Sequence, residues 1–83
     1  MTQQFFDSLG KRLSVNDTVL VQRIPEELLK DLPAEDQDAI NGCLGQFLTI
    51  VSFDSYGHAE IEFTDQQGNF HTIWIHTNCL LKQ

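Results

Sequence analysis

The segment from Phe47 to Ile75 constrains the fold more than any other part of the chain. It contains three apolar, strand-like runs separated by two turn sequences, at Asp54 to Gly57 and at Asp65 to Asn69. Asp, Asn and Gly are residues that tight turns prefer, so the segment predicts a three-stranded antiparallel meander. Shorter strand-like runs at Asp17 to Arg23 and at Cys79 to Lys82 add two strands. Together they predict a mainly β fold built as a five-stranded barrel.

The length of the last hairpin loop decides on which face of the sheet Trp74 lies. If Gly68 takes the positive φ of a three-residue loop, Trp74 falls opposite Glu60 on the solvent-facing side. A loop shorter by one residue would instead place Trp74 beside Ile61 in the core. We prefer the first register, because it buries the isoleucines on either side of Trp74 against an alternating partner strand.

The chain length favours a single binding domain over an enzyme. The 83 residues suffice for one domain with a compact core, expected to span residues 1–83. So small a core leaves little volume for a deep internal pocket, which favours binding through the surface. The glycines are dispersed and none belongs to a phosphate-binding loop, so we expect no cofactor.

The charge of the chain is strongly acidic and unevenly distributed. The formal net charge is -7, from 12 acidic and 5 basic side chains. This field repels phosphate backbones, so nucleic acid is not an expected partner. Half of the acids lie between Glu26 and Asp38, where Lys30 is the only basic residue. Such a run is usually a solvated loop; the alternative is a docking face for a basic partner, with Glu35, Asp36 and Asp38 as candidate contacts.

The start of the chain and the cysteines indicate a cytoplasmic protein. The first residues are polar and uncharged, without the apolar run of a signal peptide. No apolar stretch reaches the roughly 20 residues that a membrane-spanning helix needs, so we expect no membrane partner. In a reducing compartment, Cys43 and Cys79 are expected to be buried, free thiols.

The N-terminal residues 1–14 predict a helical arm. Phe5, Leu9 and Leu13 are four positions apart and would form one apolar stripe on a helix. We expect a helical turn or two over residues 3–9, packing the two phenylalanines over an open end of the barrel. The alternative is a loose arm that becomes ordered on binding.

Residues 24–44 are expected to form an acidic helical insertion between the first and second strands of the barrel. Pro25 and Pro33 are each followed by acidic residues, and both residue types are favourable at the start of a helix. Asn41 and Gly42 suit the end of the second helix. The acidic cluster would therefore lie on this insertion.

The segment from Val15 to Val21 reads Val-Asn-Asp-Thr-Val-Leu-Val, with Asn16 suited to the left-handed conformation of a tight turn. It resembles the entry of SH3-like barrels, with Asn16 in place of the usual glycine. The order of predicted elements from Val15 to Lys82 also resembles this superfold, whose last long strand is followed by a short helical turn and a closing strand. The resemblance implies that the insertion is the long first loop, often a partner-binding element. The signatures of peptide-binding SH3 domains are absent, so recognition of proline-rich ligands is not implied.

Trp74 is the strongest candidate for a functional residue. On the solvent-facing side it would lie with Tyr56, Glu60 and Glu62, making a shallow site for a peptide with basic and apolar or proline groups. Alternatively, the insertion helices cover Trp74 and a backbone carbonyl accepts its indole N–H.

His71, His76 and Cys79 lie close in sequence and raise the possibility of a metal or thiol site. His71 and His76 are five positions apart on one strand and so face opposite sides of the sheet. This prevents both from binding one ion without a bulge. For a Cys79 nucleophile the sequence offers neither an orienting group nor oxyanion donors. We therefore expect neither a metal nor a catalytic residue.

These observations favour a non-enzymatic protein-interaction or accessory module. Its partner would be a protein or peptide, and a basic one if the acidic insertion binds it. Two alternatives remain open. One is a small accessory protein with a metal or thiol site at His71, His76 and Cys79, and the other is a structural subunit that self-associates through Phe5 and Phe6.

Overall fold

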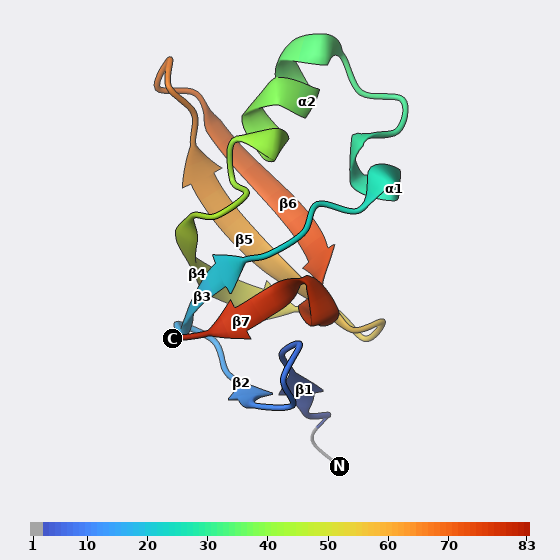
Figure 1. The fold of residues 1–83 in the computed structure, drawn as a ribbon, viewed down its shortest axis with the longest axis vertical. Helices are drawn as coiled ribbons and strands as arrows, with labels where there is room; N and C mark the ends of the chain where they lie inside the picture. The colour runs from blue at the N-terminus through green and yellow to red at the C-terminus, as the bar shows by residue number, and fades with distance from the viewer. Residues whose placement is uncertain (1–2) are drawn as a thin grey trace.

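The computed structural model describes residues 3–83 and is mainly β (Figure 1). Of these described residues, 40% are in strands and 19% are in helices. The order of elements after residue 15 is the predicted one: a strand, a helical insertion, a three-stranded meander, a short helical turn and a closing strand. The elements are β1 (Phe5–Phe6), β2 (Arg12–Leu13), β3 (Thr18–Val21), α1 (Glu26–Leu29), α2 (Ala34–Asn41), β4 (Phe47–Phe53), β5 (His58–Thr64), β6 (Phe70–His76), the 3₁₀ turn η1 (Thr77–Cys79) and β7 (Leu80–Lys82).

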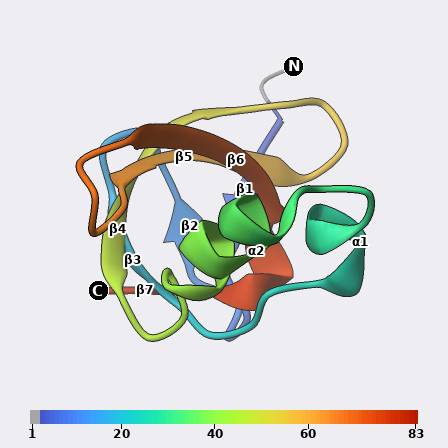
Figure 2. The same cartoon turned by 90° about the horizontal axis from the view of Figure 1, so that it is seen from above.

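Five strands form one antiparallel sheet in the order β6-β5-β4-β3-β7, and β1 pairs with β2 in a separate two-stranded sheet. The larger sheet curves, and both helices lie on its open side when the molecule is seen from above (Figure 2). Within residues 3–83, no ladder joins the edge strands β6 and β7. The mainly β class is confirmed, whereas the five strands do not close into the predicted barrel.

The ladder between β5 and β6 has the register that places Trp74 on the outer face of the sheet. Glu60 pairs with Trp74 across the ladder. The loop closes where the backbone N–H of Asp65 donates to the carbonyl of Asn69 at 2.9 Å. Gly68 has a φ of 84° in this loop. The predicted three-residue loop is therefore confirmed, and the shorter alternative is excluded.

Two turn glycines provide a stability test of this local geometry. Gly57 and Gly68 have left-handed φ values of 88° and 84°. A Cβ on Gly68 would meet nothing within 4 Å, whereas a Cβ on Gly57 would lie 3.3 Å from Nε2 of His76. We expect Gly68→Ala to lower the free energy of unfolding by about 1–2 kcal/mol through backbone strain alone. Gly57→Ala should lower it further, because His76 must also move. Urea denaturation measures both losses, and equal losses would contradict the close approach of His76.

A β-bulge at Val51 allows β4 to turn two large side chains toward the core. The ladder to β5 shifts by one residue between Ile50 and Ser52, and the extra residue, Val51, is exposed. Because the shift resets the alternation of the strand, Phe53 packs against the same core as Ile50. The bulge explains why this stretch is apolar at both odd and even positions.

The core lies inside the curve of the sheet and is closed by α2 and the N-terminal hairpin. Alternate residues of β3, β5 and β6 supply much of it, as the period-two pattern predicts. The buried apolar residues are Leu13, Val19, Val21, Ile40, Cys43, Ile50, Ala59, Ile61, Phe63, Ile73, Ile75, Cys79 and Leu80.

The prediction of a helical arm over residues 1–14 is wrong. Its first two residues lie outside the described part of the chain, and the rest contains a hairpin in which Phe5 pairs with Leu13. Leu13 is buried, and Phe5 stacks on Phe53 with 4.2 Å between the ring centroids. The segment therefore packs on the core as expected, but as a hairpin, and Phe6 remains exposed.

Asp7 explains why this segment turns back instead of forming a helix. Its carboxylate accepts hydrogen bonds from the backbone N–H groups of Leu9 (2.9 Å), Lys11 (2.8 Å) and Lys82 (2.8 Å). Side-chain bonds of this kind compete with the helical hydrogen bonds of the backbone. Burial raises the pKa of Asp7, but the three N–H donors outweigh it and hold the pKa below its ordinary value. Asp7 thereby ties the hairpin to β7, and Figure 1 shows the hairpin lying beside this strand.

The predicted helical insertion is confirmed as two short helices between β3 and β4. Pro25 and Pro33 directly precede α1 and α2, and acidic side chains occupy the first turn of each. Asp31, between the helices, has a φ of 64°. The second helix ends at Asn41, as expected. Gly42 keeps a helical backbone conformation, and the residue with a left-handed φ, of 79°, is Gly45, further along the chain.

Candidate functional site

The structure separates the predicted contact residues into two regions. The acidic residues Glu35, Asp36 and Asp38 lie on α2, beside the loop that joins β5 to β6. The others lie on the β4–β5 turn and on the outer face of β5 and β6, and they are Tyr56, Glu60, Glu62 and Trp74. Each region has its own hollow, and no described residue lines both.

The first hollow is acidic and lies between α2 and the β5–β6 loop. Carboxylates from Glu35, Asp36, Asp38 and Asp65 line it. No lysine or arginine among residues 3–83 does so, and the remaining titratable side chain there, His71, is bonded to Asp65. The structure therefore brings together all three predicted acidic residues and adds a fourth.

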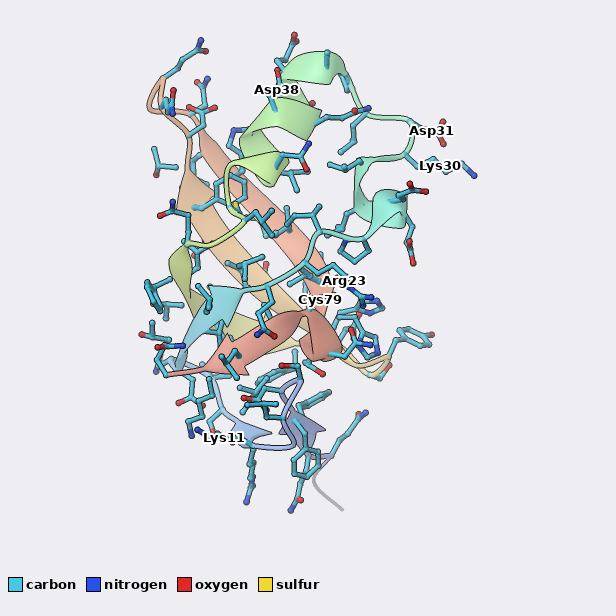
Figure 3. The ribbon with its side chains drawn as sticks, viewed as in Figure 1. Lys11, Arg23, Lys30, Asp31, Asp38 and Cys79 are labelled. Carbon is cyan, nitrogen blue, oxygen red and sulfur yellow. The ribbon has the colours of Figure 1, made fainter. Side chains whose placement is uncertain are left out.

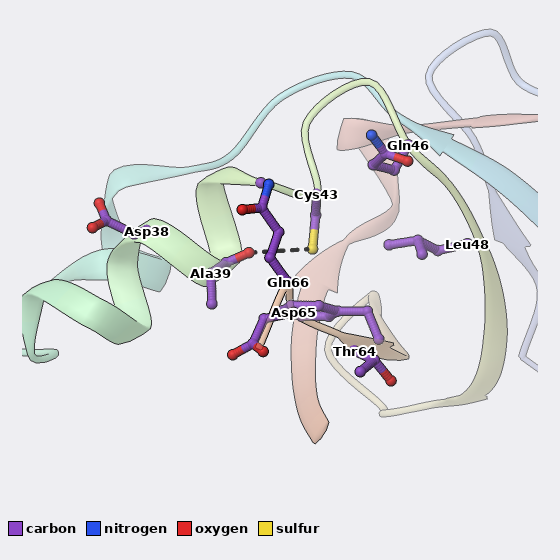
Figure 4. A pocket seen from close by; sticks show the side chains of 10 residues that line it. Asp38, Ala39, Cys43, Gln46, Leu48, Thr64, Asp65 and Gln66 are labelled. Carbon is purple, nitrogen blue, oxygen red and sulfur yellow. Dashed lines mark hydrogen bonds between the residues drawn. The ribbon is translucent and has the colours of Figure 1, made fainter. Parts of the chain in front are cut away.

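An apolar wall continues this hollow toward the sheet. The adjoining hollow shares Asp38 and Asp65 with it and is also lined by Cys43 and Leu48 (Figure 4). Phe63 lines it as well. Leu48 and Phe63 come from β4 and β5, beyond the last paired residues of the ladder between these strands. The two hollows form one groove, the α2 groove, with carboxylates along its rim and apolar side chains along its wall.

Asp65 is held as a fixed negative charge at the loop end of the α2 groove. Its Oδ2 lies 2.8 Å from Nε2 of His71, and its Oδ1 accepts the backbone N–H groups of Gln67 and Asn69. The hydrogen bond with His71, followed by the bond from Asn69, lowers the pKa of Asp65 to about 2. The sequence pattern marks Asp65 only as a turn residue, so this fourth carboxylate was not predicted.

The thiol of Cys43 lies at the inner end of the α2 groove and is not activated for chemistry. Its Sγ donates to the carbonyl oxygen of Ala39 at 3.9 Å, the dashed contact in Figure 4. Burial raises the pKa of Cys43 to about 11, so the sulfur is protonated at neutral pH. Cys43 and Cys79 are both free and buried, which confirms the prediction for the two cysteines.

The second hollow, the Trp74 hollow, lies where the outer face of β6 meets the insertion. Trp74 is 41% exposed, and Pro25 and Leu28 of the insertion line the hollow with it. Trp74 therefore faces outward from the sheet, as the first alternative predicted, and the insertion leaves it exposed. Arg23 also lines this hollow. The sequence analysis missed it, because no local pattern relates Arg23 to a residue on β6.

Tyr56, Glu60 and Glu62 do not line the Trp74 hollow. Tyr56 is 80% exposed on the β4–β5 turn. Glu60 is the cross-strand neighbour of Trp74, and its carboxylate accepts a hydrogen bond from Oγ of Ser52 at 2.7 Å. These side chains lie on the open surface beside the hollow, so they do not form with Trp74 the single shallow site that the sequence predicted.

His71, His76 and Cys79 do not come together. His71 is bonded to Asp65 at the loop end of β6, whereas Nδ1 of His76 accepts the N–H of Asn78 at the other end. Cys79 is 1% exposed. In the part of the chain that is described, no three His, Cys, Asp or Glu side chains are placed to hold a metal ion. The alternative of a metal or thiol site at these residues finds no support in this geometry.

No protein-family model, curated protein or solved structure matches this chain. In residues 3–83, no helix has both the length and the apolar character required to cross a membrane. The chemistry of the α2 groove and of the Trp74 hollow is therefore the basis for inferring a function.

Proposed function

We propose that this chain is a non-enzymatic protein-interaction module that binds a basic and apolar segment of a partner protein in the α2 groove. One observation carries the proposal: the carboxylate rim of this groove has no lysine or arginine beside it among the described residues, and an apolar wall adjoins it. A lysine or arginine of the partner would meet the rim. An apolar side chain next to it would cover the half-buried Leu48 and the small part of Phe63 that remains exposed.

The charge of the chain supports this choice of partner. A net charge of -7 attracts a basic segment from a distance and speeds its association. Because the pKa of Asp65 is about 2, this rim carboxylate stays ionised throughout the physiological pH range. The apolar wall adds affinity, at roughly 25 cal/mol for each Å² of apolar surface removed from water.

We further propose that the fold is a variant of the SH3-like barrel with the helical insertion in its long first loop. The strand order β6-β5-β4-β3-β7 and the η1 turn before β7 are consistent with this assignment. In such domains the first loop often contacts the partner, and α2 belongs to it here. Exposed Tyr56 and Trp74 provide a second contact area for a larger partner.

Binding of a short peptide that contains lysine and leucine tests the proposed function. We expect the peptide to shift the amide NMR signals of α2 and of residues 65–71. The double variant Glu35→Gln/Asp38→Asn should bind about 2- to 30-fold more weakly, because each exposed ion pair contributes roughly 0.2–1 kcal/mol.

A matched control separates the α2 groove from the overall charge. The double variant Glu26→Gln/Asp31→Asn removes the same number of charges from positions that do not line this groove. It should bind the peptide nearly as well as the wild type. If the two double variants weaken binding equally, only the net charge matters and the α2 groove is not the site.

A further inference from the structure

We propose that the Trp74 hollow is a second binding site, distinct from the α2 groove, for a carboxylate attached to a flat apolar group. Its chemistry differs from that of the rest of this acidic chain. Arg23, His58, His76 and Asn78 line it, and among residues 3–83 Glu27 is the only acidic residue that does. A basic ligand suits the α2 groove, whereas an anionic one suits this hollow.

Arg23 supplies the cationic group of the Trp74 hollow. It is exposed, and its Nη2 is held by Oδ1 of Asn78 at 3.3 Å and Sγ of Cys79 at 3.4 Å. Figure 3 shows Arg23 and Cys79 side by side where the chain after β3 passes η1. None of the ion pairs within residues 3–83 involves Arg23, although acids outnumber bases in this chain. The guanidinium thus keeps donors for a bidentate bond to a carboxylate.

Two imidazoles add oriented polar groups beside Arg23. Nδ1 of His58 lies 2.8 Å from Oδ2 of Asp54, which fixes the ring. Nδ1 of His76 accepts the backbone N–H of Asn78 at 3.2 Å, so the neutral ring of His76 carries its proton on Nε2. The two rings meet edge to face with 5.7 Å between their centroids. His76 therefore keeps an Nε2–H donor, whereas the Nδ1–H of His58 already donates to Asp54.

The apolar side chains of the hollow determine the rest of the ligand. Trp74, 41% exposed, presents part of a flat ring, and Pro25 and Leu28 extend the apolar surface beside it. A planar group attached to the carboxylate would pack against Trp74 while the carboxylate reaches Arg23. An aromatic monocarboxylate, free or at the C-terminal residue of a peptide, has this chemistry.

Titration of the isotope-labelled full chain with phenylacetate tests the proposal. We expect shifts of the Trp74 indole N–H and the Arg23 side-chain N–H, with an affinity of about millimolar because the ligand has few atoms. Phenylethylammonium, which has a similar shape and the opposite charge, should cause none of these shifts. Arg23→Gln should weaken phenylacetate binding at least about tenfold, and Arg12→Gln, an exposed arginine on β2, should not.

A second pair of probes distinguishes the source of the carboxylate. If acetyl-glycyl-phenylalanine binds more tightly than phenylacetate and its C-terminal amide does not bind, the ligand is a peptide C-terminus. If phenylacetate binds at least as tightly, the ligand is a free small carboxylate. Absence of shifts, equal binding of phenylethylammonium, or wild-type affinity in Arg23→Gln would overturn the proposal. The amide spectrum shows in the same experiment whether each variant is folded, and the comparison of the two charged probes needs no variant.

Discussion

Replacing Ile61 with alanine is expected to lower the free energy of unfolding by about 2–5 kcal/mol. Ile61 is 0% exposed and sits on β5, where it pairs with Ile50 on one side and Ile73 on the other. The truncation removes apolar contacts and leaves a cavity between neighbours that the sheet holds apart. Because domains of this kind are stable by only about 5–15 kcal/mol, the variant would lose a large part of its stability. Urea denaturation followed by Trp74 fluorescence measures the loss.

Two matched variants provide reference values for the stability loss expected of Ile61→Ala. Ile61→Val removes a single methyl group and should cost about 0.5–1.5 kcal/mol. Glu62→Ala changes the next residue, which points to solvent, and should alter stability by no more than about 0.5 kcal/mol. A loss below about 1 kcal/mol for Ile61→Ala would mean that β5 is not the centre of the core.

Asp7→Ala is expected to cost about 2–4 kcal/mol, an unusually large effect for removing a polar side chain. The substitution leaves the backbone N–H groups of Leu9, Lys11 and Lys82 without their acceptor. Asp7 is only 6% exposed, so water replaces these bonds poorly. Asp7→Asn should rescue only part of the loss, because its amide oxygen can still accept from Leu9 and Lys11 while its NH₂ group would face the N–H of Lys82.

The contribution of Asp7 should also depend on pH in a defined direction. The folded state holds the pKa of Asp7 below its ordinary value. The stabilisation is therefore complete above about pH 4, near the unfolded pKa, and is lost as the pH falls through the folded pKa. The stability difference between the wild type and Asp7→Asn should be constant near neutral pH and shrink in acid. Urea denaturation at several pH values measures it.

Asp38→Ala serves as the control for Asp7, because Asp38 is an exposed helical residue. It removes the same charge and should change stability by no more than about 0.5 kcal/mol at any of these pH values. If Asp7→Ala and Asp38→Ala had equal effects, the carboxylate of Asp7 would not hold the hairpin to β7.

The meander could be predicted from sequence because its signals are local. Alternation of apolar and polar residues identified the core face of β5, and Gly68 identified the loop that turns Trp74 outward. Both signals act over a few neighbouring residues, where period and turn geometry leave few alternatives. The prolines before α1 and α2 are also local signals, and they correctly predicted where these helices begin.

The N-terminal segment and the lining of the two hollows depend on contacts between distant residues. The spacing of Phe5, Leu9 and Leu13 satisfies a helix. The hairpin forms instead with help from the backbone N–H of Lys82, which donates to Asp7 from a distant part of the sequence, and no local pattern reports this bond. Arg23 reaches the neighbourhood of Trp74 only after β3 and β6 have taken their places. The acids of α2 are close in sequence and could be recognised as a cluster. Their position opposite Asp65 depends on contacts between distant residues and could not be predicted.

The pairing of β3 with β7 has a consequence for the order of folding. Val19 pairs with Lys82, so this part of the sheet closes a loop that contains most of the chain. The β5–β6 hairpin, in contrast, forms from adjacent residues. Closing a long loop costs entropy before any contact compensates for it, and proteins rich in such distant pairings fold slowly. One edge of β3 therefore stays open until β7 has been synthesised, and this sheet is completed only after that.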